Sequence, residues 1–212
     1  MANTTDDNLR HRHLRISVAS PWVQRFAPLI RSAGTVLDLA AGGGRHSRHL
    51  LELGYRTVTI DRNGEPLAAL QSEPGATIIE ANLEGDPPPF SPGGALAGRR
   101  FDGIVVVNYL HRPLFDDLIA ALTPGGVLIY ETFARGHEAY ARPRNPEHLL
   151  HAGELLKAFG GRLQIIAYEH GRLDVGDVPG VKQRLCAVND LTISTHEGGE
   201  PDAHPLDPRK PL

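Results

Sequence analysis

Short, almost uninterrupted apolar runs constrain the fold of this chain most strongly. "GIVVVN" lies in an expected strand at 101–108 and "GVLIYETF" in one at 126–132. Similar runs predict strands at 35–39, 56–60 and 76–80. Runs of this kind are typical of strands buried on both faces, which belong to parallel sheets covered by helices.

Segments with helical spacing separate these runs. They predict helices at 45–53, 65–71 and 113–122. A further helix is expected to begin near Asn145, which can cap it, with Pro146 in its first turn and Glu147 at its positive end.

The sequence from 162 to 193 follows a different pattern. Two strand-like segments, 162–171 and 181–193, are joined by a Gly-containing link that is too short for a helical crossover, so this pair should be antiparallel. The whole pattern predicts an α/β fold in one domain: a doubly wound, Rossmann-like sheet of seven mostly parallel strands. The last strand should be antiparallel and inserted between its neighbours.

Bulk properties predict a soluble, cytoplasmic, one-domain protein. The 212 residues suit a single core, and they divide into a flexible arm at 1–15, a domain at 16–193 and a disordered tail at 194–212. The net charge of −3 gives no reason to expect nucleic acid as a partner. The single cysteine fits a reducing compartment, and no apolar run is long enough to span a membrane. The oligomeric state stays open.

The segment "VLDLAAGGGRHSRHL", residues 36–50, leads from a strand through three glycines into a helix. A phosphate loop needs a Lys-Ser/Thr pair after the last glycine, and this chain has none. A dinucleotide site needs a third glycine where Ser47 stands, and this departure disfavours that hypothesis. The third hypothesis is S-adenosylmethionine, which needs close backbone approach but no phosphate cradle.

Acidic residues at the ends of the strands favour the third hypothesis. Asp38 ends the first strand, Asp61 follows the second, and Glu84 follows the third. An ionised carboxylate at Asp61 can accept hydrogen bonds from both hydroxyls of a ribose. The glycines would let the main chain lie against the ribose and the amino-acid arm of the cofactor.

This arrangement resembles the class I S-adenosylmethionine-dependent methyltransferases over about residues 20–193. "NYLHRPLF", "YETFARG" and "RPRNPEHLL" resemble small bacterial members of the tellurite-resistance and thiopurine type. The resemblance implies S-adenosyl-L-methionine as cofactor and S-adenosyl-L-homocysteine as product. It also implies a set of cofactor-binding residues: Asp38, Ala40, Gly42, Gly44, Asp61, Arg62, Asn82, Leu83 and Asn108.

Two of these positions depart from the family pattern. The family usually has Gly where Ala40 stands, and alanine is tolerable there if the backbone is not left-handed. Many members have Asp where Asn82 stands. The amide oxygen of Asn82 can still accept a hydrogen bond from adenine, while Leu83 supplies a main-chain N–H.

The resemblance places the reaction just after the fourth strand. Tyr109 and His111 are the candidate catalytic residues there, and Glu131 is a third candidate at the expected pocket rim after the fifth strand. His111 would take a proton from the acceptor. The alternatives are that Tyr109 packs against the cofactor and that His111 only orders the loop. The chain lacks the two prolines that follow Asn108 in enzymes acting on exocyclic amines of nucleic acids.

Two other clusters carry weaker signals. The charged connection at 135–144 has the length and composition of a lid, although a solvated loop explains it equally well. His46 and His49 lie one turn apart, but no third ligand accompanies them, so no metal is expected. We therefore expect a methyltransferase acting on a small-molecule acceptor by in-line transfer. The alternatives are an RNA or protein methyltransferase and a non-catalytic sensor or interaction protein that binds the same cofactor.

Overall fold

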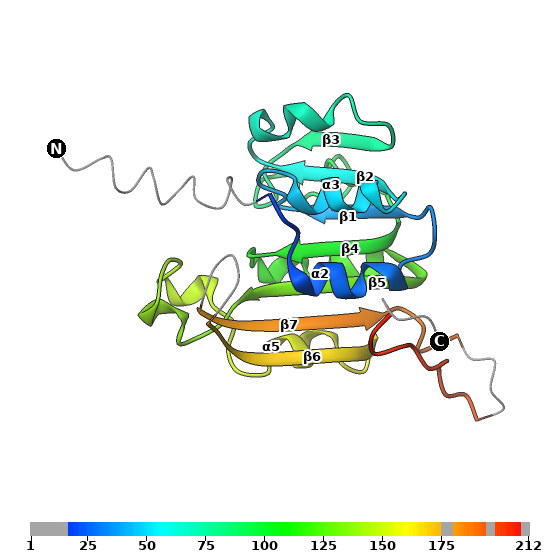
Figure 1. Ribbon diagram of the computed structural model, residues 1–212, viewed down its shortest axis with the longest axis vertical. Coiled ribbons are helices and arrows are strands. Elements are labelled where there is room, and N and C mark those ends of the chain that lie inside the picture. Colours follow the sequence, from blue (N-terminus) through cyan, green and yellow to red (C-terminus); the bar gives the residue numbers. More distant parts are fainter. Residues whose placement is uncertain (1–16, 175–179, 194–197, 209–212) are drawn as a thin grey trace.

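A single mixed β-sheet organises the molecule (Figure 1). The computed structural model describes residues 17–174, 180–193 and 198–208, and within them seven strands form this sheet in the order β3-β2-β1-β4-β5-β7-β6. The strands are β1 (Thr35–Leu39), β2 (Arg56–Asp61), β3 (Ala76–Glu80), β4 (Phe101–Val107), β5 (Leu122–Phe133), β6 (Gln164–Leu173) and β7 (Gly180–Val188).

The first five strands run parallel, and β7 pairs antiparallel with both β5 and β6. The predicted topology is therefore confirmed, including the insertion of the last strand between its neighbours. The strand order reverses between β1 and β4, which both lie at the centre of the sheet. In open α/β sheets, ligands bind outside the carboxyl ends of the strands at such a switch point.

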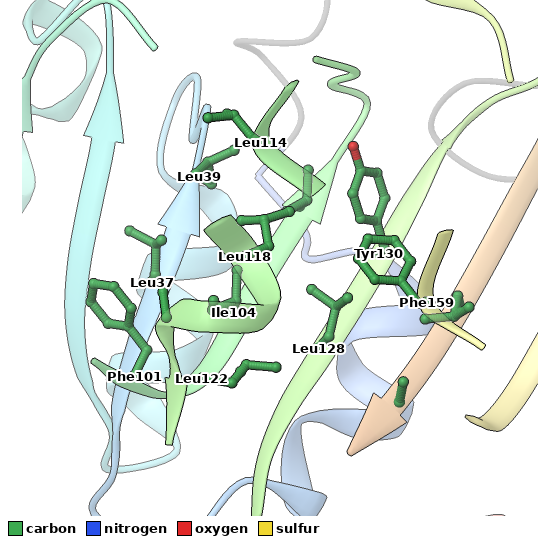
Figure 2. Packing of buried hydrophobic residues seen from close by; sticks show 14 of the residues in the cluster. Leu37, Leu39, Phe101, Ile104, Leu114, Leu118, Leu122, Leu128, Tyr130 and Phe159 are labelled. Atoms are coloured by element: carbon green, nitrogen blue, oxygen red, sulfur yellow. The ribbon is translucent and has the colours of Figure 1, made fainter. Parts of the chain in front are cut away.

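Helices cover both faces of the sheet. On one face, α2 (Pro21–Phe26) and α3 (Arg45–Glu52) pack against strand residues through Trp22, Phe26 and Leu50. On the other face, α4 (Phe115–Ala121) and α5 (Glu154–Phe159) pack against a second cluster of strand residues. Figure 2 shows Leu118 of α4 over the sheet near Ile104, and Tyr130 beside Phe159.

Short 3-10 segments replace parts of the predicted helices. The segment expected at 65–71 is the 3-10 turn η3 (Glu65–Leu70). The helix expected at 113–122 divides into η4 (Arg112–Leu114) and α4, and β5 already begins at Leu122. The strand expected at 181–193 ends at Val188.

The helix predicted from Asn145 is wrong. Asn145 does cap a turn, as expected, but only the 3-10 turn η6 (Pro146–His148) follows, and α5 begins at Glu154. The guanidinium of Arg112 donates hydrogen bonds to the carbonyls of Glu147 and Leu149, at 2.6 and 3.0 Å. A continuing helix would need those carbonyls for its own N–H groups.

The ends of the chain are described in part. The arm expected at 1–15 lies outside the described residues. Of the tail expected at 194–212, residues 198–208 are described; they form no helix or strand, but they contact the body of the protein. The carbonyl of Leu206 accepts a hydrogen bond from Arg25 at 2.8 Å, and His204 lies 2.6 Å from Asp190. In the described part of the chain, no helix is long and apolar enough to cross a bilayer.

Candidate functional site

The loop between β1 and α3 adopts an unusual backbone conformation. Ala40, Gly42 and Gly44 all have positive φ, at 55°, 57° and 71°. Alanine was expected to be tolerable at position 40 only if the backbone there is not left-handed, and this condition is not met. A left-handed alanine is strained by about 1–2 kcal/mol. The loop holds this conformation at the carboxyl end of the central strand, which is where the switch point lies.

The glycines in this loop have different neighbours. A Cβ atom on Gly44 would lie 2.5 Å from Cδ1 of Leu70 and 2.9 Å from Cδ2 of Leu67, so Gly44 lets α3 pack closely against η3. The backbone N–H of Gly42 donates a hydrogen bond to Oδ2 of Asp61 at 2.8 Å. Gly44 thus serves packing, whereas Gly42 lies at the edge where β1 and β2 end.

Asp61 joins two of the predicted cofactor-binding segments. Its Oδ2 binds Gly42, and its Oδ1 accepts the N–H of Asn63 at 3.1 Å. Its own carbonyl accepts the N–H of Ala81, which begins the segment after β3. The side chain is only partly buried, so the carboxylate retains access to a ligand. Arg62 beside it is exposed.

Asp38 lies behind the loop rather than in it. Its side chain is buried, and its Oδ2 accepts hydrogen bonds from the N–H and the hydroxyl of Ser47, at 3.0 and 2.6 Å. Burial raises the pKa of Asp38 to about 6, although the hydrogen bonds from Ser47 oppose this rise. Asp38 therefore supports the first turn of α3, and a direct contact with a ligand would require the loop to open.

The segment after β3 faces the segment after β4. Asn82 is exposed, and its Oδ1 accepts the N–H of Glu84 at 3.1 Å, whereas Leu83 is buried in the core. The hydroxyl of Tyr109 donates to Oε1 of Glu84 at 3.3 Å. Burial, together with this nearby carboxylate, raises the pKa of Tyr109 above its ordinary value, so the phenol stays protonated.

The segment after β4 brings Asn108, Tyr109 and His111 to the same edge. Asn108 is left-handed, with φ of 58°, and its N–H donates to the carbonyl of Glu131 at 2.8 Å. The carbonyl of Tyr109 accepts the hydroxyl of Tyr130 at 3.0 Å. The imidazole of His111 is partly exposed and has no hydrogen-bond partner among residues 17–174, 180–193 and 198–208. His111 is therefore available to a ligand.

Glu131 lies in the interior, not at the rim. Its side chain is 3% exposed; Oε1 is paired with Nζ of Lys182, and Oε2 accepts the hydroxyl of Ser20 at 2.6 Å. Nε of Arg184 lies 3.5 Å from Oε2. Burial by itself would raise the pKa of Glu131, but the attraction of the two cations outweighs it, and the pKa lies below its usual value.

Lys182 was missed by the sequence analysis. It is buried on β7, it contacts Glu131, and it also donates to Oδ1 of Asn108 at 2.9 Å. Two cations on one face of β7, Lys182 and Arg184, are a signal in the sequence, but their partners on neighbouring segments are set by tertiary pairing.

Two histidines are buried near this edge. His46 lies in the first turn of α3, with its Nδ1 3.9 Å from Oδ1 of Asp38. His137, in the expected lid, stacks on Phe133 with 4.1 Å between ring centres, and its Nε2 lies 3.0 Å from the carbonyl of Arg142. The connection at 135–144 is therefore anchored by His137, while most of its other residues are exposed. In the described residues, no group of three His, Cys, Asp or Glu side chains could hold a metal ion.

The sheet order and the acids and glycines at its central edge define a class I, Rossmann-like methyltransferase fold. The chain belongs to a methyltransferase family, because the family model described as "Methyltransferase domain" matches residues 10–165. S-adenosylmethionine is the cofactor of this class. A comparison with curated proteins finds no match.

Solved structures of methyltransferases share the fold. TehB from Haemophilus influenzae has a TM-score of 0.64 at 18% identity, and the match covers 86% of this chain and 66% of TehB. The N-methyltransferase NodS from Bradyrhizobium japonicum WM9, in complex with S-adenosyl-L-homocysteine, has a TM-score of 0.58 at 17% identity, with 88% and 99% covered. The 1,6-didemethyltoxoflavin-N1-methyltransferase from Burkholderia thailandensis has a TM-score of 0.55 at 18% identity, with 87% and 86% covered.

Proposed function

We propose that the protein transfers a methyl group from S-adenosylmethionine to a small molecule by in-line displacement. The observation that carries this proposal is the contact between Asp61 and Gly42, which sets a carboxylate beside a left-handed loop at the switch point of the sheet. A carboxylate in this position suits the hydroxyls of a ribose, and the loop suits close backbone approach.

The remaining residues at this edge receive separate roles. Asn82 and the main chain of Leu83 lie after β3, where they would bind the adenine. Ala40, Gly42 and Gly44 would shape the loop along the amino-acid arm, and Asp38 would hold that loop from behind through Ser47. Arg62 and Asn108 would flank the cofactor on either side.

The methyl acceptor would meet Tyr109 and His111. When bound, S-adenosylmethionine supplies an activated methyl group, so the protein mainly positions the acceptor and excludes water. His111 is free to accept a proton from an acceptor that must lose one. Glu131 is not suited to that task, because its side chain is buried and both of its carboxylate oxygens are already paired.

A small molecule is the favoured class of acceptor. The chain has a net charge of −3, which provides no overall electrostatic attraction for nucleic acid. The toxoflavin-type methyltransferase named above was solved with 1,6-didemethyltoxoflavin bound, and that compound is a small molecule. The likeness supports the same acceptor class here.

Calorimetry with S-adenosylhomocysteine, NAD and ATP tests the cofactor. We expect binding of S-adenosylhomocysteine alone; tighter binding of NAD would overturn the proposal. Turnover with S-adenosylmethionine is then measured as S-adenosylhomocysteine formed in the presence of a metabolite panel. Turnover dependent on one acceptor, and lost in His111→Gln, would support the assigned roles. Binding without turnover on any member of the panel would favour a sensor protein instead.

A further inference from the structure

The buried pair of Lys182 and Glu131 does more than neutralise charge, because Lys182 has a third partner. Its ammonium donates both to Oε1 of Glu131 and to Oδ1 of Asn108, and it also lies 5.1 Å from the ring centre of Phe133. Lys182 stands opposite Phe133 in the β5–β7 register. It thus links the last strand of the sheet to the end of β4.

Asn108 is the first residue of the segment that carries the candidate reaction residues. It is held in a left-handed conformation, which asparagine tolerates better than most residues but which still needs support. Its N–H is bound by the carbonyl of Glu131, and its side-chain oxygen is bound by Lys182. Residues on β5 and β7 therefore fix both the backbone and the side chain of Asn108.

The chemistry of an ammonium group also fixes the orientation of the Asn108 amide. A lysine ammonium can only donate, so it binds the oxygen of the amide and never the nitrogen. The Nδ2 group, which can only donate, must then face away from Lys182. It has no hydrogen-bond partner within the described parts of the chain, so it stays available to a ligand at the carboxyl end of β4.

We propose that Lys182 is a positioning residue of the cofactor site: it holds Asn108 so that Nδ2 is presented to the cofactor and the following residues, Tyr109 to His111, are directed to the acceptor. The inference rests on the proposed function of this edge. Glu131 has the supporting role of balancing the charge that Lys182 brings into the interior.

The alternative is that Lys182 only neutralises Glu131. Arg184 provides a matched control, because it is a second cation on β7 that approaches Glu131, at 3.5 Å, but has no contact with Asn108 among the described residues. Arg184→Met should therefore remove one cation near Glu131 and leave the hydrogen bond to Asn108 in place. Lys182→Met should remove a cation near Glu131 and also break the hydrogen bond to Asn108.

The first measurement is the affinity for S-adenosylhomocysteine by calorimetry. A single hydrogen bond corresponds to roughly a 2- to 12-fold change in affinity. We expect Lys182→Met and Asn108→Ala each to weaken binding by that amount, and Lys182→Met with Asn108→Ala to bind no more weakly than Asn108→Ala alone. Arg184→Met should bind within about twofold of the wild type. Unchanged affinity in Lys182→Met, or additive losses in the double variant, would overturn the proposal.

If Lys182→Met fails to fold, a double variant in which both Lys182 and Glu131 are neutral can be tested in its place. Lys182→Met combined with Glu131→Gln removes both buried charges, and neutral replacements of buried pairs are often well tolerated. This double variant should fold, as judged by circular dichroism, yet bind as weakly as Asn108→Ala. Recovery of wild-type affinity would show that Lys182 serves only to neutralise Glu131.

The second measurement does not depend on the cofactor. The side-chain amide resonances of Asn108, assigned by their loss in Asn108→Ala, should move in Lys182→Met and stay in place in Arg184→Met. Equal movement in both variants would contradict the positioning role. If the wild type does not bind S-adenosylhomocysteine at all, the proposed function fails, while the resonances still report whether Lys182 orients Asn108.

Discussion

The carboxylate of Asp61 accepts a hydrogen bond of 2.8 Å from the backbone N–H of Gly42. This contact ties the end of β2 to the loop after β1 and sets the carboxylate beside the left-handed turn. Each carboxylate oxygen has two lone-pair sites, so the bonds to Gly42 and Asn63 leave capacity for two ribose hydroxyls.

Replacing Asp61 tests the ribose contact. The loss of charged hydrogen bonds costs about 1.5–3 kcal/mol, so Asp61→Ala should weaken binding of S-adenosylhomocysteine roughly 10- to 150-fold in calorimetry. Asp61→Asn retains the shape and one carbonyl oxygen, and it should lose less affinity. Unchanged affinity in Asp61→Ala, with an intact circular dichroism spectrum, would remove Asp61 from the site.

Gly42 and Gly44 should respond differently to substitution. Gly42→Val should abolish binding of S-adenosylhomocysteine, because the valine side chain would enter the space along the loop. Since the backbone is left-handed at this position, the substitution should also lower the free energy of unfolding by about 1–2 kcal/mol. Gly44→Ala adds a clash with Leu70 to the same strain, and it should lower the free energy of unfolding by about 2–5 kcal/mol. Urea unfolding gives both costs; a larger stability loss in Gly42→Val would contradict the division of roles.

Ala40→Gly should stabilise the protein. A left-handed alanine is strained by about 1–2 kcal/mol, and glycine removes this strain at an entropic cost of about 0.5–1 kcal/mol. The expected net change is a gain of up to about 1.5 kcal/mol in the free energy of unfolding, measured in urea. A loss of stability would show that the alanine methyl group contributes packing that outweighs the strain.

His46 should make the protein sensitive to acid. Burial lowers the pKa of His46 from 6.5 to about 3, so the unfolded chain binds a proton between these values and the native protein does not. Neutral His46 therefore makes its full contribution to the free energy of unfolding above pH 6.5, and this contribution is lost as the pH falls from 6.5 towards 3. Asp38 provides little counter-charge, because it takes up a proton itself near pH 6.

The matched variant is His46→Gln, which cannot become charged. Between pH 6.5 and 4, the free energy of unfolding of the wild type should fall about 2–3 kcal/mol further than that of His46→Gln. Urea unfolding at a series of pH values measures both curves. Parallel curves would mean that His46 is protonated in the native protein.

Local patterns in the sequence were enough to predict the sheet and to bring the glycine loop and Asp61 to the same edge of it. Continuous apolar runs indicate strands buried on both faces, and a helix-free link indicates an antiparallel pair, because both signals depend only on neighbouring residues. The glycine loop and Asp61 follow directly from strands that end at the same edge. Their positions in the structure agree with that reasoning, and the contact between them is local to adjacent strands.

Tertiary structure decided the features that depend on partners far away in the sequence. Asn145 begins a turn and no helix, because Arg112 takes the carbonyls that a helix would use. Glu131 is buried and Lys182 is placed beside Asn108 because β7 inserts next to β5. A charged residue in a sequence shows only that a partner is needed in the interior; which partner it meets depends on strand pairing and register, and these are fixed only when the whole sheet has formed.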